Sequence, residues 1–157
     1  MLSKALIQLC WVEAKMKKLT EKILAIFAKN QTVSLATIAT DGKPWVRYVT
    51  LFAKADFPLL FCTDSGSRKI THIKNNPEVH ITCGNLAPPD DSVYLQIQAR
   101  ATVITDLKTK RSYWNEEYLR YFKGPDDPNY VIVQVEPYRI EYYGPDSFVP
   151  QIWEPVN

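Results

Sequence analysis

Alternating hydrophobic and polar residues predict that β-strands form most of this chain. Residues 32–39 (TVSLATIA) have the period of two that characterises a strand with one buried face. The residues expected on that face are Val33, Leu35, Thr37 and Ala39. Asp41-Gly42 then predicts a tight hairpin, because a two-residue turn favours residues that adopt positive φ. Residues 44–53 form the returning strand.

The remaining strands are expected between turn and loop sequences that contain Pro, Gly and Asp. They cover residues 59–63, 78–84, 92–105, 130–136 and 138–143, and Pro137 separates the last two. In residues 92–105 polar positions alternate with apolar ones, so one face of this strand meets water or a ligand. Six or seven strands joined mainly by hairpins predict a mostly β fold of the α+β class, an antiparallel barrel with flanking helices.

Four segments have the spacing or the capping residues of helices. They are residues 4–18 with Ser3 as N-cap, 21–30 with Thr20 as N-cap, 67–75, and 106–122 with Asp106 as N-cap. We expect one domain over residues 1–157, with a helical segment over about residues 1–30 and an extended tail over about residues 144–157. Trp153 in that tail is expected to lie against another surface, such as that of a second subunit.

Composition and charge narrow the classes of function. A net charge of +2 without a long basic run argues against nucleic acid as a partner. No apolar run is long enough to span a bilayer, so no membrane partner is expected. Three cysteines, an odd number without a CxxC spacing, predict neither a disulfide framework nor a zinc site. Free thiols fit a reducing compartment, and we expect a cytoplasmic protein without a metal site.

The start of the third predicted helix carries the candidate chemistry. Arg68 and Lys69 lie in its first turn, where positive charge opposes the helix dipole. A bound anion would remove this conflict, because helix N–H groups, two cations and neighbouring hydroxyls together suit a phosphate. The hydroxyls are those of Thr63, Ser65 and Ser67. The alternative is a surface loop in which the two cations only solvate the end of the helix.

Other single residues allow two interpretations each. Arg47 is a lone charge in a largely apolar strand, and it either reaches water from the barrel end or donates hydrogen bonds to a ligand. Cys62 is expected to be a buried, inert thiol rather than a redox group. His72 and His80 are either proton donors or surface residues, and His72 lies on the helix that would meet the phosphate; surface roles are expected for both. Four aromatic residues pack either in the core or a dimer interface, or form a wall beside a partner's ligand: Tyr113, Trp114, Tyr118 and Tyr121.

Four segments occur in a fixed order along the chain. They read VSLATIATDGKPWVRYV, FCTDSGSRKITHIKNNPEV, YLQIQARATVITD and PYRIEYYG. Together they resemble the pyridoxamine 5'-phosphate oxidase-like FMN-binding split-barrel family, and most closely its general stress protein branch. The resemblance covers about residues 19–143. It implies an antiparallel split β-barrel of six to seven strands with flanking helices, and a homodimer with FMN at the subunit interface.

The resemblance also implies roles for particular residues. In such proteins an Arg-Lys pair, here Arg68 and Lys69, holds the FMN phosphate together with nearby hydroxyls such as those of Thr63 or Ser67. The isoalloxazine ring lies along the strand that begins at the family's Arg and contacts the next strand. The corresponding residues are Arg47, Tyr48, Val49, Thr50, Cys62 and Thr63. The assignment agrees with the chemistry, since a phosphate dianion favours guanidinium, ammonium and helix N–H donors.

Some positions depart from the true oxidases of this family. Phe52 stands where they often have a lysine, Tyr143 replaces a C-terminal Trp, and their Arg-x-His substrate motif is absent. We therefore expect an FMN-binding oxidoreductase-like protein, not a pyridoxamine phosphate oxidase. It would pass electrons from a small-molecule donor to an unknown acceptor. Two alternatives stay open: a flavin-binding or stress-response module without turnover, and the same fold holding a deazaflavin or haem. No catalytic residue is predicted.

Overall fold

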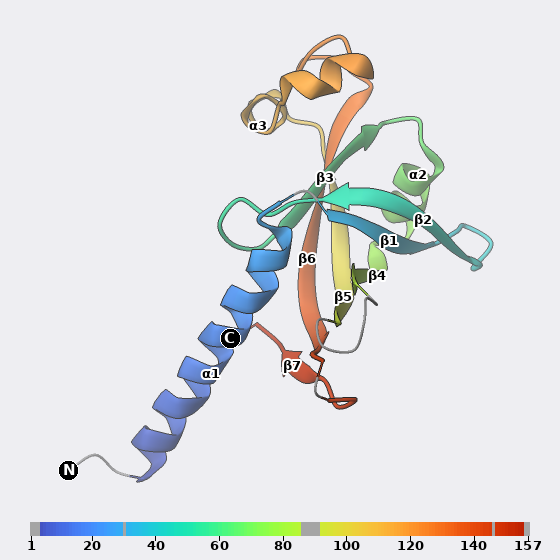
Figure 1. Ribbon diagram of the computed structural model, residues 1–157. Helices are drawn as coiled ribbons and strands as arrows, with labels where there is room; N and C mark the ends of the chain where they lie inside the picture. The colour runs from blue at the N-terminus through green and yellow to red at the C-terminus, as the bar shows by residue number, and fades with distance from the viewer. Residues whose placement is uncertain (1–3, 30, 86–91, 146, 156–157) are drawn as a thin grey trace.

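The computed structural model describes residues 4–29, 31–85, 92–145 and 147–155; the predicted cap Ser3 lies outside these ranges. The described residues form seven strands, three α-helices and a 3-10 helix, η1 (Figure 1). The helices are α1 (Lys4–Phe27), α2 (Arg68–Asn75), α3 (Leu107–Ser112) and η1 (Glu116–Arg120). The strands are β1 (Gln31–Ile38), β2 (Pro44–Leu51), β3 (Leu59–Asp64), β4 (Glu78–Asn85), β5 (Val93–Ile104), β6 (Tyr130–Tyr143) and β7 (Gln151–Trp153).

All strand pairs are antiparallel, and they form one sheet in the order β2-β1-β4-β5-β6-β3, with β7 beside β6. The sheet curls until its two edges meet at one bridge, where Phe52 and Leu60 exchange two backbone hydrogen bonds of 2.9 Å. Within the described residues β2 and β3 form no continuous ladder, so the barrel is split between them. The predicted class, an antiparallel split barrel with flanking helices, is therefore confirmed.

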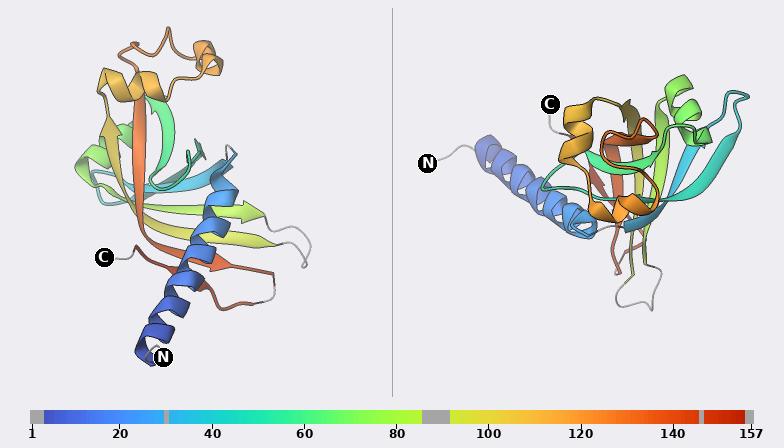
Figure 2. Two further views of the ribbon diagram at one scale, coloured as in Figure 1. Left: turned by 90° about the vertical axis from the view of Figure 1, so that its left-hand side faces the viewer. Right: turned by 90° about the horizontal axis from the view of Figure 1, so that it is seen from above.

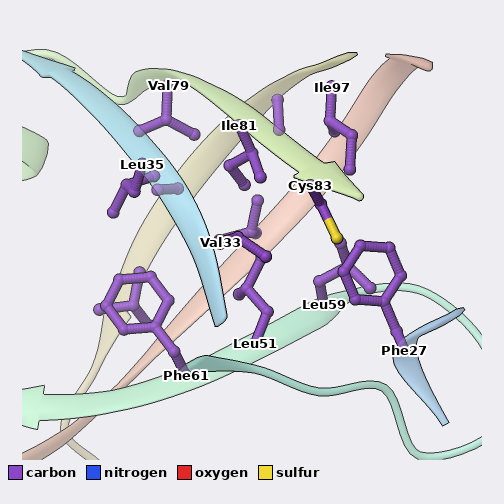
Figure 3. Packing of buried hydrophobic residues seen from close by; sticks show 14 of the residues in the cluster. Phe27, Val33, Leu35, Leu51, Leu59, Phe61, Val79, Ile81, Cys83 and Ile97 are labelled. Carbon is purple, nitrogen blue, oxygen red and sulfur yellow. The ribbon is translucent and has the colours of Figure 1, made fainter. Parts of the chain in front are cut away.

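The predicted alternation along the strands is confirmed by the core. Val33, Leu35 and Thr37 of β1 are at most 1% exposed, and Figure 3 shows the first two among the inward side chains of β3 and β4. Burying one such aliphatic or aromatic side chain contributes about 1.5–3 kcal/mol. The core therefore fixes the positions of β2 and β3, whose ends carry the candidate site.

The N-terminal segment forms one helix, so the prediction of two helices is wrong. α1 continues through Thr20, whose hydroxyl donates to the Met16 carbonyl oxygen at 3.0 Å instead of capping a second helix. A hydroxyl bonded to the carbonyl four residues earlier is compatible with a helix interior. The C-terminal half of α1 packs on the core up to Phe27, whereas its N-terminal half projects away from the barrel (Figures 1 and 2). No helix in the described ranges is long and apolar enough to cross a membrane.

The single helix predicted over residues 106–122 is also wrong. Asp106 caps α3 as predicted, and its side chain accepts the Thr109 N–H at 2.8 Å, but α3 is short. Asn115 then accepts the Glu117 N–H at 2.9 Å and begins the separate helix η1. Asn favours N-cap positions over helix interiors, and this local preference overrides the helical spacing of the aromatic residues.

β6 is one strand, although the sequence predicts a break at Pro137. The strand accommodates the proline through a shift of register against β5 between Gln98 and Ala99, and such irregularities tolerate a residue without an N–H donor. The tail forms β7, which pairs with β6 of the same chain. Trp153 is 7% exposed, and its Nε1–H donates to Thr20 Oγ1 at 2.8 Å. This part of the tail therefore lies against its own chain.

Candidate functional site

Three positively charged side chains from β2 and α2 lie close together. Arg68 and Lys69 begin α2, and Arg47 comes from β2. Burial lowers the pKa of Lys69, and the charge of Arg47 lowers it further. Burial also lowers the pKa of Arg47, with an additional effect of the Arg68 charge. Within the described residues none of the three forms an ion pair with a carboxylate. Their mutual repulsion is offset only in part, by the charge of Asp64 at Lys69.

Lys69 is fixed beside two hydroxyl groups. Its Nζ donates to Thr63 Oγ1 at 2.8 Å, and Ser67 Oγ lies 3.5 Å from the same oxygen. Ser67 is the N-cap residue of α2, but its side chain makes no capping hydrogen bond. The Asp64 carboxylate raises the pKa of Lys69 but accepts the Gly66 N–H at 2.7 Å rather than pairing with Lys69. An ammonium group, two hydroxyls and the start of a helix therefore meet at one point.

Arg47 is held by one of its guanidinium nitrogens. Nη1 donates to Thr37 Oγ1 at 2.6 Å, to the Trp45 carbonyl oxygen at 2.9 Å and to the Leu35 carbonyl oxygen at 3.2 Å. Nε and Nη2 make no hydrogen bond within the described part of the chain. The side chain therefore does not simply extend to water. Its anchored nitrogen leaves the other donors available to a ligand.

Arg68 stacks on an aromatic ring. Its Cζ atom lies 4.3 Å from the centroid of the Trp45 ring, which is a favourable cation–π distance. This contact uses the face of the guanidinium and leaves the N–H groups at its edge able to donate hydrogen bonds. The Trp45 ring is in turn 6.5 Å from the imidazole of His72. His72 is 8% exposed, and its Nδ1 lies 2.9 Å from Thr37 Oγ1. The surface role expected for His72 is therefore wrong.

A pocket of about 600 Å³ adjoins these cations, which is within the range of about 300–1,000 Å³ typical of small-molecule sites. Its walls come from β2, β3, the start of α2 and the segment around η1. Six predicted site residues line it: Tyr48, Val49, Thr50, Cys62, Thr63 and Lys69. The other three, Arg47, Ser67 and Arg68, do not line the pocket but lie beside it. Arg47 is near Lys69 and Arg68, and Ser67 is near Thr63.

The segment around η1 forms a wall of the pocket in its own chain. The residues from this segment are Glu117, Tyr118, Arg120, Tyr121 and Phe122. Tyr113 instead packs against Phe52 at 6.1 Å between ring centroids, and Trp114 against Tyr130 at 5.1 Å. The predicted core packing is therefore confirmed for Tyr113 and Trp114. The two other aromatic candidates face a pocket of the same chain.

Cys62 lies in the pocket wall and is only partly buried, whereas a buried thiol was predicted. Burial raises the pKa of Cys62, and a hydrogen bond with the Tyr118 hydroxyl lowers it by less. Burial in turn raises the pKa of Tyr118 to about 12. Because the thiolate is the reactive form of cysteine, these surroundings support the prediction of an inert thiol.

Sequence reasoning missed Thr37 as a neighbour of the site, and it weighed a position of His72 beside the phosphate but favoured a surface role. Thr37 lies on the inward face of β1 among apolar residues, which is the signal that was available. A buried hydroxyl must find a hydrogen-bond partner, but the sequence does not reveal that the partners are Arg47 and His72.

The fold defines the class as antiparallel split-barrel proteins, here with three cations clustered at the start of α2 and the neighbouring part of β2. The sequence profile described as "Pyridoxamine 5'-phosphate oxidase" matches residues 19–144, and the chain belongs to this family. General stress protein 26 from Bacillus subtilis (strain 168) is 32% identical over 117 residues, which are 74% of this chain and 82% of the relative.

Solved structures agree with this placement. General Stress Protein 26 from Bacillus anthracis str. Sterne is 34% identical, has a TM-score of 0.73, and covers 87% of this chain and 98% of its own. Two more distant structures share the fold alone. An F420 reductase is 23% identical, has a TM-score of 0.57, and covers 74% of this chain and 93% of its own. A heme binding protein from Mycobacterium smegmatis is 16% identical, has a TM-score of 0.64, and covers 82% of this chain and 55% of its own. The chain thus lies in the general stress protein branch of the family.

Proposed function

We propose that this protein binds FMN and passes electrons from a small-molecule donor to an unknown acceptor. The observation that carries the proposal is the meeting of three cations without carboxylate partners, within the described residues, beside a pocket of about 600 Å³. Such a cluster is unfavourable alone, and a phosphate dianion offsets its repulsion. Membership of a family that often binds flavin supports the same cofactor.

In this proposal the phosphate lies at the start of α2. Arg68 and Lys69 provide the main charges, Arg47 adds the donors that its own chain leaves free, and Thr63 and Ser67 add hydroxyls. The side chain of the N-cap residue does not cap the helix. The Ile70 N–H donates to the Ser67 carbonyl oxygen at 2.9 Å, and the N–H groups of Arg68 and Lys69 remain available to an anion. Lys69 and the Thr63 hydroxyl already lie at hydrogen-bond distance, which limits the reorganisation needed for binding.

The pocket walls suit the flat ring of the cofactor. Tyr48, Val49 and Thr50 of β2 form one side, and Phe52 and Tyr118 add aromatic surface. FMN supplies the redox chemistry when bound. The protein holds the phosphate, orients the ring and excludes water, and it needs no acid or base of its own to do so.

The substrate side differs from that of a pyridoxamine phosphate oxidase. Phe52 lines the pocket where those oxidases often have a lysine. The apolar ring of Phe52 provides no charge for the phosphate of a substrate, which would be a second phosphate beside that of FMN. We therefore propose that this protein does not take pyridoxamine 5'-phosphate as its substrate.

A homodimer with FMN at the interface is part of the proposal. Val46 and Tyr48 on the outward side of β2 are 63% and 77% exposed, and Tyr121 is 74% exposed. Tyr48 and Tyr121 also line the pocket, so a second copy of the chain covers apolar surface and the pocket edge together. The free thiols Cys10, Cys62 and Cys83 support the proposed location in the cytoplasm.

The alternatives use the same positive site. A flavin-binding module without turnover needs the phosphate anchor but no acceptor, and a deazaflavin also carries phosphate. Haem has carboxylates instead of a phosphate, so the site favours it less. The absorption spectrum separates these cofactors, and oxidation of a reduced nicotinamide with a panel of acceptors separates an enzyme from a binding module.

The test is the spectrum of the purified protein before and after FMN is added, together with its size by gel filtration. Flavin bands near about 370 and about 450 nm on a dimer support the proposal. Arg68→Ala is expected to weaken FMN binding by about 1.5–3 kcal/mol, because a charged hydrogen bond is lost. Lys74→Ala, which removes one exposed charge from the other end of α2, is the control. Equal affinities of the two variants would remove Arg68 from the site.

A further inference from the structure

We propose that Thr37 and His72 are positioning residues that hold Arg47 in the phosphate site, and that this arrangement makes the site select phosphorylated flavin. The inference rests on the proposed function. The geometry that carries it is a chain of hydrogen bonds across three elements. Arg47 of β2 donates to Thr37 Oγ1 of β1 at 2.6 Å, and the same oxygen lies 2.9 Å from Nδ1 of His72 on α2. Thr37 is 1% exposed and His72 is 8% exposed.

The protons in this series of hydrogen bonds have one arrangement in which every donor has an acceptor. The Arg47 guanidinium has donors only, so Thr37 Oγ1 must accept from it. The Thr37 hydroxyl proton is then free to point to His72 Nδ1, which places the imidazole proton on Nε2. With the opposite imidazole tautomer the Thr37 proton would face no acceptor within the described residues. Leaving such a buried donor unpaired is unfavourable. The geometry therefore assigns Nδ1 of His72 as the acceptor.

This series of hydrogen bonds fixes the position of the Arg47 guanidinium and its charge. Burial lowers the pKa of Arg47 and so opposes its charge, and Arg68 repels it. Without specific acceptors a flexible arginine would turn toward water. Thr37 and two backbone carbonyl oxygens instead retain Nη1, and the charge stays near Lys69. His72 links the same hydroxyl to α2, the helix that carries Arg68 and Lys69. Both sides of the phosphate site thus share one buried hydroxyl.

The experiment compares the affinities of FMN and riboflavin, which differ by the phosphate alone. The variants are Thr37→Val, which keeps the shape and removes the hydroxyl, and Thr37→Ser, which restores it. Thr82→Val, on the exposed side of β4, is the matched control. Thr37→Val is expected to weaken FMN binding about tenfold and leave riboflavin binding unchanged, and Thr37→Ser is expected to recover most of the loss. Equal losses for both flavins, or no loss, would overturn the inference.

His72 provides an independent arm. Gln in place of His72 retains an acceptor for the Thr37 hydroxyl, whereas His72→Leu has none. We expect His72→Leu to lose FMN selectivity and His72→Gln to retain it. In addition, nitrogen NMR of the imidazole is expected to show Nε2 protonated in the wild type. A proton on Nδ1 would overturn the assigned hydrogen bonds.

The outcomes distinguish this inference from the proposed function. If the wild type binds neither flavin, the proposed function fails, and inorganic phosphate becomes the probe. Thr37→Val must then weaken phosphate binding relative to Thr82→Val; an unchanged phosphate affinity would overturn the inference. Thermal unfolding of each variant checks that the fold is intact, and the pair His72→Leu and His72→Gln keeps the test decisive if Thr37→Val unfolds.

Discussion

At the level of single residues, the candidate site brings together positively charged side chains that repel one another. Arg47, Arg68 and Lys69 gather where burial and neighbouring positive charges lower the pKa of Arg47 and Lys69. Asp64 offsets only part of this repulsion, at Lys69. In the proposed function the cations favour binding at the expense of the unliganded fold, as functional sites commonly do.

Replacement of Lys69 tests this balance. Because the pKa of Lys69 in the folded protein lies below its ordinary value of 10.5, the charged side chain is less favourable in the fold than in the unfolded chain. This penalty is full at neutral pH and is relieved as the pH rises through the folded pKa. Lys69→Met is thus expected to stabilise the cofactor-free protein at pH 7 by on the order of 0.5 kcal/mol, a small value because solvent screens a partly exposed charge. Urea unfolding measures it, and a destabilised variant would show that the Thr63 hydrogen bond matters more.

FMN binding should depend on pH through the same side chain. A phosphate dianion needs Lys69 protonated, and the pKa of Lys69 is lowered by burial and by Arg47. As the pH rises, the affinity for FMN is therefore expected to begin to fall at a pH below 10.5, the ordinary pKa of a lysine. Fluorescence titrations of FMN across the alkaline range measure this loss. Lys69→Arg keeps its charge over the whole range, so its affinity should stay level. The same alkaline loss in this variant would exclude Lys69 as the cause.

At the level of elements, the strands were predictable because each has one face in the core. The alternation in β1 survives in the structure, with Val33, Leu35 and Thr37 buried. The helices were less predictable, because hydroxyl and amide side chains serve both as caps and as interior residues. Thr20 lies inside α1, bonded to Met16, whereas Asn115 does begin a new helix. Sequence spacing alone does not separate these two outcomes.

Gly84 of β4 is an element-scale constraint that stability measurements can test. Its φ is +143°, and a Cβ atom placed there would lie 2.5 Å from the Tyr94 Cα atom of β5. Gly84→Ala is expected to destabilise the fold by about 2–5 kcal/mol, from backbone strain and steric overlap together. Gly42, at φ +81° in the predicted hairpin with nothing within 4 Å, is the control. Gly42→Ala should cost only about 1–2 kcal/mol. Equal losses in chemical unfolding would mean that β4 and β5 separate easily.

At the level of the whole molecule, part of the site could be predicted because it is local in sequence. Thr63, Ser67 and Lys69 follow one another within a few residues, and the structure brings their polar groups together. The contact between Thr37 and His72 spans 35 residues, and the pocket wall around η1 comes from still further along the chain. Such contacts depend on how the barrel closes, which hydrophobic periodicity does not specify. Family resemblance filled part of this gap, but it did not supply Thr37 or its contact with His72.

The proposed dimer makes the last prediction. Val46 lies on the outward side of β2, 63% exposed, next in sequence to Arg47 and two residues from Tyr48, which lines the pocket. In a single chain Val46→Glu should change stability by no more than about 0.5 kcal/mol, as for most exposed positions. In a dimer that covers β2 the same carboxylate would be buried without a partner, and the subunits should separate.

Sedimentation and FMN titration together measure this effect. Val46→Glu is expected to convert the dimer to a monomer and to weaken FMN binding, because the exposed pocket edge loses its cover. Leu107→Glu adds the same charge at another exposed apolar position, 48% exposed at the start of α3, and should remain dimeric. If Val46→Glu also remains dimeric with unchanged FMN affinity, the subunits meet elsewhere. The pocket with its three cations would then act within one chain, and the second copy would have no part in holding the cofactor.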